Sequence, residues 1–193
     1  MDEPYPDNLP VVGACSPCNS SFSKDESYLA YLIESALVGS TDPDSFLRPK
    51  IRRIFANEPS IRALIQSSRQ ENGVMWKADV ARVRNVVLKL ARGHAAFECS
   101  EPMLQEPSLV SFVPRNLLSE EELSSFETAP VETVFPELGS LAFLKSVVVD
   151  TRVFLSDGWH VVQPGRYRYL VSWSGPFIVR CVLSEYLFCE VAW

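Results

Sequence analysis

Apolar residues recur at helical spacing in the first part of the chain. Between residues 23 and 37 they lie three and four positions apart, which predicts one helix with a single buried face. Ser23 followed by Glu26 has the spacing of a capping box, so we expect the helix to begin there and to end before Gly39. The first 22 residues include four prolines and are expected to form loops and turns.

Three further helices are predicted in the middle of the chain. The segments 48–55 and 59–68 each carry a proline near the first turn, where its missing amide proton costs nothing. The segment from about residue 77 to residue 97 has valine and leucine at helical spacing, with arginine and lysine mostly on the other side. We expect this long amphipathic helix to be the scaffold of the fold.

After residue 98 the pattern changes to runs of β-branched and aromatic residues that alternate with polar ones and are separated by turn signals. This alternation predicts an antiparallel meander. The predicted strands lie at 159–162, 167–173, 177–183 and 187–193. The stretch 119–140 is expected to be a connector, or alternatively a short solvated helix opened by Ser119.

Together these elements predict an α+β fold. Residues 1–40 hold an N-terminal cysteine motif and the first helix, and residues 41–98 form a basic helical region with the long amphipathic helix. Residues 99–193 form a β-rich region packed on the helices. We expect the three segments to form one compact unit.

Composition limits the class of protein. With 193 residues and 47% hydrophobic content, the chain can bury a core of ordinary size. It has no long apolar run and its first residues lack the features of a signal peptide, which predicts a cytoplasmic protein without a membrane partner. The five cysteines are an odd number and mostly scattered, so we expect reduced thiols or a metal at the close pair Cys15 and Cys18.

Charge is unevenly distributed along the chain. The formal net charge is −6, yet residues 45–95 hold eleven Lys/Arg against three Asp/Glu, a local charge of +8. Such a basic segment fits an anionic partner, and one interpretation is a surface that follows the phosphates of a nucleic acid. Its alternative is a solvated helical face, or internal ion pairs with the acidic segments on either side. The candidate nucleic-acid-binding residues are Arg48, Lys50, Arg52, Arg53, Arg82, Arg84, Lys89 and Arg92.

A Cys-x-x-Cys turn at Cys15 and Cys18 can place two thiolates on one zinc ion. A structural zinc takes four ligands, and the chain has no second pair at such spacing. Other thiols and the two histidines, His94 and His160, are distant in the sequence. The spacing therefore predicts half of a zinc site.

The segments Tyr5-Pro6-Asp7-Asn8-Leu9, Ala14-Cys15-Ser16-Pro17-Cys18-Asn19 and Phe22-Ser23-Lys24-Asp25-Glu26 together resemble the second half of the HNH (ββα-metal) endonuclease finger, a family with bacterial members. The resemblance implies a partial finger, with Asn8 shaping the loop and Cys15 and Cys18 as the second zinc pair. It places Asn19 near the catalytic divalent metal, such as magnesium. The family's first cysteine pair and its general-base histidine are absent before Tyr5.

Phosphodiester hydrolysis by this motif needs a base that activates water and a metal that stabilises the leaving oxygen. We therefore expect a DNA-binding relative of HNH endonucleases that is inactive in this chain, either because the chain begins late or because it is a degenerate relative. His94, near the end of the long helix where a cation is favourable, and His160, in a strand, are expected to be structural.

Two other functions remain open. The first is a non-catalytic protein–protein interaction module, or an inhibitory one, that acts on a nucleic-acid-handling complex. The second is a homodimer in which Cys15 and Cys18 of two chains share one zinc ion, which would supply four thiolates.

Overall fold

The computed structural model describes residues 3, 5–6, 9–70, 76–128, 158–173 and 176–193, with the side chains of Cys18 and Ser21 outside the description. The fold is α+β, as predicted, and its strands form an antiparallel sheet. The described residues group into two compact units. Residues 14–86 form the helical unit, and residues 3–13 with 87–193 form the sheet unit. No helix among the described residues is long and apolar enough to cross a membrane.

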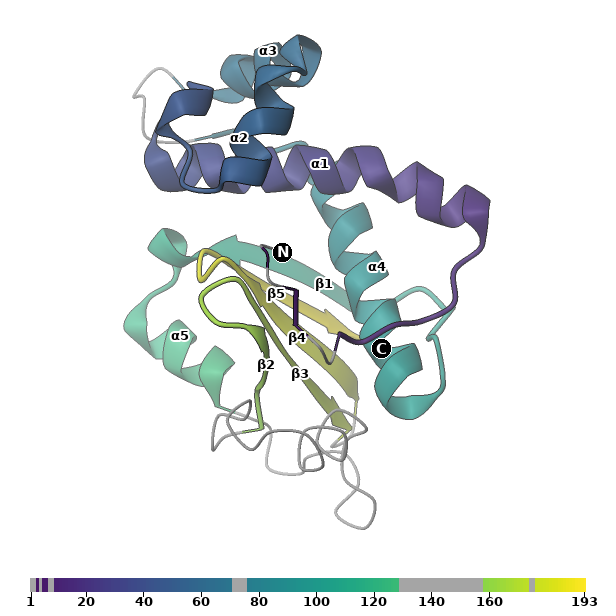
Figure 1. The fold of residues 1–193 in the computed structure, drawn as a ribbon. Helices are drawn as coiled ribbons and strands as arrows, with labels where there is room; N and C mark the ends of the chain where they lie inside the picture. The colour runs from purple at the N-terminus through teal and green to yellow at the C-terminus, as the bar shows by residue number, and fades with distance from the viewer. Residues whose placement is uncertain (1–2, 4, 7–8, 71–75, 129–157, 174–175) are drawn as a thin grey trace. The chain divides into compact units, whose positions relative to one another are not determined.

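The helical unit is built around helix α1 (Ser16–Val38), with α2 (Pro49–Ala56) and α3 (Pro59–Ser68) beside it (Figure 1). A short 3-10 helix, η1 (Pro43–Ser45), connects α1 to α2. Aromatic rings fill the core: the ring of Phe55 lies 4.8 Å from that of Tyr31 and 5.0 Å from that of Phe46. All three side chains are buried, which anchors α2 on α1.

Helix α1 begins at Ser16, not at Ser23, so the predicted capping box is wrong. The Ser23 hydroxyl instead donates to the carbonyl of Ser20, one turn earlier in a continuous helix. The predicted loop over the first 22 residues is therefore also wrong for residues 16–22. Pro17 does not prevent this earlier start, because in a first helical turn the amide proton has no partner to lose.

Helix α4 (Val80–Cys99) begins three residues later and ends two residues later than the predicted 77–97. Asp79 precedes it, and its carboxylate accepts hydrogen bonds from the backbone amides of Ala81 at 3.1 Å and Arg82 at 3.3 Å. The Asp79 amide donates to the Tyr28 hydroxyl on α1 at 2.9 Å. This acidic N-cap satisfies amide groups that have no partner inside the helix. The boundary between the two units runs through α4 at residue 87, whereas the predicted segments end at residues 40 and 98.

The described residues of the sheet unit form five strands in the order β1-β5-β4-β3-β2, all paired antiparallel. Strands β2 (His160–Gln163), β3 (Tyr167–Trp173), β4 (Phe177–Leu183) and β5 (Leu187–Ala192) form the predicted meander. Strand β1 (Leu109–Pro114) was not predicted and pairs with β5 at the edge of the sheet. Its short apolar run lies between two prolines, which fits an edge position.

The sheet is covered on both faces. Tyr169 and Leu170 are neighbours on β3, so their side chains point to opposite faces. The Tyr169 ring stacks on His94 of α4, with 3.7 Å between ring centroids. Leu170 lies on the other face in a core cluster against which Phe126 packs.

Phe126 belongs to the short helix α5 (Glu120–Glu127), which lies beside the sheet in Figure 1. Ser119 opens this helix with a complete capping box, in which its hydroxyl accepts from the Glu122 amide at 3.1 Å. The short helix opened by Ser119, given as the alternative to a connector, is confirmed, so the expected connector is wrong for residues 120–127. The rest of the predicted connector, residues 129–140, lies outside the described residues.

Candidate functional site

The cysteine motif lies at the start of α1. The carbonyl of Cys15 accepts a helical hydrogen bond from the Asn19 amide at 2.9 Å, so Cys15 occupies the N-cap position. Cys18 lies in the first turn, but its side chain is outside the description, as is all of Asn8. Cys15 and Asn19 are both exposed. The motif is therefore a helix N-terminus and not the loop that the sequence predicted.

The described residues contain no group of three or more His, Cys, Asp or Glu side chains that could hold a metal ion. A structural zinc ion takes four ligands, and a catalytic one takes three protein ligands with an open position. The described part of the chain therefore does not form a complete zinc or magnesium site.

Three of the predicted basic residues are held by contacts within their own units. Arg82 forms ion pairs with Asp25 at 3.6 Å and Asp79 at 3.4 Å. For this residue the structure has the internal ion pairing that was the alternative to a nucleic-acid-binding surface. The Arg92 guanidinium donates to carbonyls in residues 103–105 at 3.1–3.3 Å. Arg52 donates to the Phe46 carbonyl at 2.7 Å. These contacts give the three arginines a structural role.

The other predicted basic residues differ in exposure. Arg48 is half-buried, and its backbone amide donates to the buried Glu34 carboxylate at 2.9 Å. Lys50 and Arg53 are exposed on α2. On α4, Arg84 is exposed and Lys89 is half-buried. Lys89, like Arg92, belongs to the sheet unit, so the eight residues do not lie in one compact unit.

The exposed charge is concentrated on α2 and α3. Sequence analysis missed Arg62, which is exposed on α3. Segment 45–70 holds six Lys/Arg and one acidic residue, Glu58, a net charge of +5. Glu58 lies against Tyr31. Burial is the larger cause and the Glu58 carboxylate the smaller cause that raise the pKa of Tyr31 to about 12. Among the described residues, Arg53 and Arg62 have no ion-pair partner. We call Lys50, Arg53 and Arg62 the basic face.

The two histidines lie in the core of the sheet unit. His94 is 5% exposed and His160 is 4% exposed. The Nε2 atom of His94 is hydrogen bonded to the Tyr167 hydroxyl, and the Tyr169 hydroxyl donates to the Glu98 carboxylate at 2.6 Å. The His160 ring meets the Tyr169 ring edge-on, with 5.0 Å between centroids.

This environment keeps both rings neutral. Burial, followed by repulsion from His160, lowers the pKa of His94 to about 3, and burial lowers the pKa of His160 to about 4. A place at the end of a helix would have favoured a protonated His94. The ring is instead neutral, because α4 continues to Cys99 and the ring is buried. Neither ring is exposed to a substrate, which supports a structural role for both.

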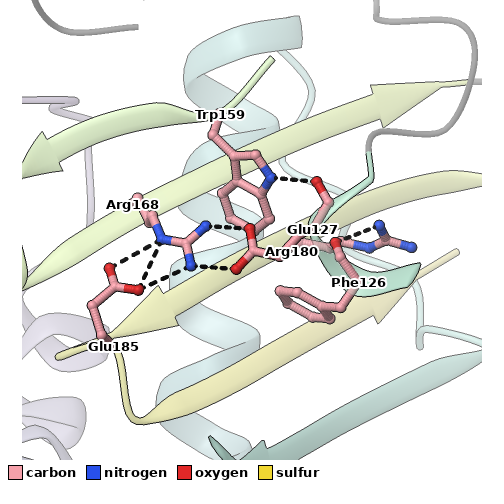
Figure 2. Close-up of polar contacts among 6 residues, drawn as sticks. All are labelled: Phe126, Glu127, Trp159, Arg168, Arg180 and Glu185. Atoms are coloured by element: carbon pink, nitrogen blue, oxygen red, sulfur yellow. Dashed lines mark hydrogen bonds and ion pairs between the residues drawn. The ribbon is translucent and has the colours of Figure 1, made fainter. Parts of the chain in front are cut away.

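A second polar cluster, around the buried Arg168, connects α5 to the sheet, and sequence analysis did not identify it (Figure 2). The Arg168 guanidinium donates to the Glu127 carboxylate at 2.6 Å and to Glu185 at 2.9–3.2 Å, above the Trp159 ring. Burial alone would lower the pKa of Arg168, but the bonds to the two carboxylates outweigh it and raise this pKa. The available signal was a single charged residue in a strand of mostly aromatic and aliphatic residues, which predicts an inward charge with a partner.

The histidine cluster, the Arg168 cluster and the basic face differ in their exposure to a binding partner. The histidine cluster is buried, and the buried Arg168 is paired with two partly exposed carboxylates, so both clusters stabilise the sheet unit. The basic face is exposed, and its segment, residues 45–70, carries a net charge of +5. Comparisons of the chain with protein-family models, with curated proteins and with solved structures found no match.

Proposed function

We propose that this protein binds DNA through the basic face of α2 and α3, as a non-hydrolysing relative of the HNH endonucleases. The observation that carries the proposal is the net charge of +5 on segment 45–70, with Lys50, Arg53 and Arg62 exposed on two adjacent helices. The resemblance of the N-terminal segments to an HNH finger is the reason to propose DNA as the nucleic acid. His94 and His160 are both buried in the sheet unit, which is the reason to propose binding and not cleavage by these residues.

The overall charge of −6 is compatible with this proposal. At about 0.1 M salt, charges interact over a Debye length of about 10 Å, so a bound phosphate responds mainly to the local face. Glu58 is the acidic residue nearest in sequence, and it is hydrogen bonded to Tyr31. Glu58 is the one carboxylate of segment 45–70, so the segment keeps a net charge of +5.

Salt dependence provides the test. Each phosphate contact releases counterions, so the logarithm of affinity falls against the logarithm of salt concentration with a slope of about −0.9 per contact. We expect fluorescence anisotropy with a labelled duplex to show this linear fall between about 50 and 200 mM salt. The double charge reversal Lys50→Glu with Arg53→Glu should make the slope shallower by about 2.

The matched control is Lys24→Glu, because Lys24 is an exposed cation on α1 outside segment 45–70. It changes the net charge in the same direction and should leave the slope nearly unchanged. Absence of DNA binding even at the lowest salt concentration would refute the proposal. In that case a protein partner becomes the better candidate, and the acidic segments would be the surfaces to test.

We also propose that Cys15 and Cys18 bind zinc, as the resemblance to the HNH finger implies. This proposal is separate from DNA binding by the basic face. Cys15 is exposed at the N-terminus of α1, where a thiolate is favoured by the helix dipole. Two thiolates supply half of a structural site, so two chains would share one ion. Elemental analysis combined with the mass in solution should find one zinc ion per dimer, and Cys18→Ser should abolish both. A zinc-free monomer would contradict this part of the proposal without affecting the DNA-binding face.

A further inference from the structure

Helix α3 leaves most of its surface uncovered by the rest of the helical unit. Ile65 is its one buried residue, and Ile61 and Ser68 are half-buried on the same side. The remaining positions of the helix are exposed, including Leu64, which is 43% exposed. These exposed residues are Pro59, Ser60, Arg62, Ala63, Leu64, Gln66 and Ser67. A helix of ten residues with one buried side chain presents a broad face to a partner.

The chemistry of this face differs from that of an ordinary solvated helix. It carries no acidic residue, and its two long polar side chains, Arg62 and Gln66, are four positions apart and share one side of the helix. Within the described part of the chain, neither side chain has a hydrogen-bond or ion-pair partner. The Ser67 hydroxyl, by contrast, donates to the Leu64 carbonyl at 2.8 Å. Arg62 and Gln66 are thus the polar groups available to a ligand.

We propose that α3 is a DNA-reading helix that enters the major groove of duplex DNA, with Arg62 and Gln66 contacting base edges. Lys50 and Arg53 on α2 then contact the flanking phosphates. This inference rests on the proposed function and adds the form of nucleic acid and the residues that read its sequence. Ten residues extend about 15 Å at a rise of about 1.5 Å each, enough to follow a few base pairs.

Side-chain geometry supports base reading in addition to phosphate binding. Arginine offers paired donors that match the two acceptors of guanine, and glutamine matches the donor and acceptor of adenine. The small apolar side chain of Ala63, next to Arg62, fits the methyl group of thymine. A surface that bound phosphates alone would need cations but no exposed amide.

Duplex DNA fits this helix better than RNA. The major groove of B-form DNA is about 12 Å wide and admits an α-helix, whereas the major groove of A-form RNA is deep and narrow.

The protein chain around α3 is also firmly held. Two residues separate α2 from α3, and the backbone of the junction is fixed by bonds from Asn57 to the Ile54 carbonyl at 3.0 Å and from Glu58 to the Phe55 carbonyl at 3.2 Å. Phe55 and Ile65, one on each helix, are fully buried.

Selection from a random duplex library by the full chain, followed by sequencing, tests the inference. We expect an enriched motif, and binding to that motif should exceed binding to its point variants on the order of tenfold to hundredfold. Arg62→Ala should relax the preference at one position of the motif, and Gln66→Ala should relax it at another. Arg62→Lys keeps the positive charge but loses the planar fork, so preference should fall while the salt slope stays unchanged.

Arg53→Ala is the matched control on α2. It should weaken binding to all sequences alike and make the salt slope shallower by about 0.9, without changing the motif. Circular dichroism should confirm that each variant is folded. DNA binding without any enriched motif, or a motif unchanged in Arg62→Ala and Gln66→Ala, would overturn the reading helix and leave the proposed function intact. Loss of all DNA binding in the unmodified protein would overturn both.

Discussion

Acidification should destabilise the sheet unit through its two buried histidines. Burial lowers the pKa of His94 to about 3 and that of His160 to about 4, against an ordinary value of 6.5. In the unfolded chain both rings take up protons below about pH 6.5, while the folded protein excludes them. Stability is therefore complete above about pH 6.5 and is lost as the pH falls from there toward 4 and then 3.

The magnitude follows from proton linkage. At about pH 5 an unfolded histidine is protonated roughly thirtyfold over its neutral form, which favours unfolding by about 2 kcal/mol for each ring. The two rings together account for about 4 kcal/mol, a large part of the roughly 5–15 kcal/mol that stabilises an ordinary domain. Because both side chains are at most 5% exposed, solvent screening reduces this effect little.

Urea unfolding followed by tryptophan fluorescence measures the effect, since three of the four tryptophans, Trp159, Trp173 and Trp193, lie in the sheet unit. The free energy of unfolding should fall between about pH 7.5 and pH 5. In His94→Gln and in His160→Gln that fall should be about 2 kcal/mol smaller than in the unmodified protein. The chain has two histidines, so the double variant is the control without imidazole titration. If its pH profile matched that of the unmodified protein, the reasoning would be refuted.

Three further predictions concern contacts of single residues. Arg168→Ala should lower the free energy of unfolding by about 3 kcal/mol because it leaves two carboxylates unpaired, whereas Glu185→Gln, at a carboxylate that is 44% exposed, should cost less than about 1 kcal/mol. Ser119→Ala removes the capping box of α5 and should cost about 1 kcal/mol in thermal unfolding, with an unchanged midpoint counting against a role for the cap. Glu34→Ala should lower the free energy of unfolding by about 2 kcal/mol because the Arg48 amide loses its acceptor. Glu34→Gln keeps an acceptor, so an equal loss of stability in both variants would exclude this explanation.

Local patterns predicted the elements whose limits depend on neighbouring residues. Helix α3 and strands β3 and β4 have the predicted boundaries, because prolines, glycines and the period of the apolar residues mark both ends of each. Strand β1 escaped prediction because its short run becomes a strand through pairing with β5, far along the chain. The start of α1 was also missed, since the capping signal at Ser23 lies inside a longer helix.

The sequence by itself identified the basic segment and the cysteine motif, because charge and spacing are visible in one dimension. Only the tertiary structure decided which cations are exposed: Arg82 meets Asp25 and Arg92 meets backbone carbonyls, while Arg53 and Arg62 remain on the surface. Likewise, only packing of α4 on the sheet determined that His94 is buried and neutral. The physical reason is that periodicity and capping act between near neighbours in the chain. Burial, ion pairing and the pKa depend on residues that meet only after folding.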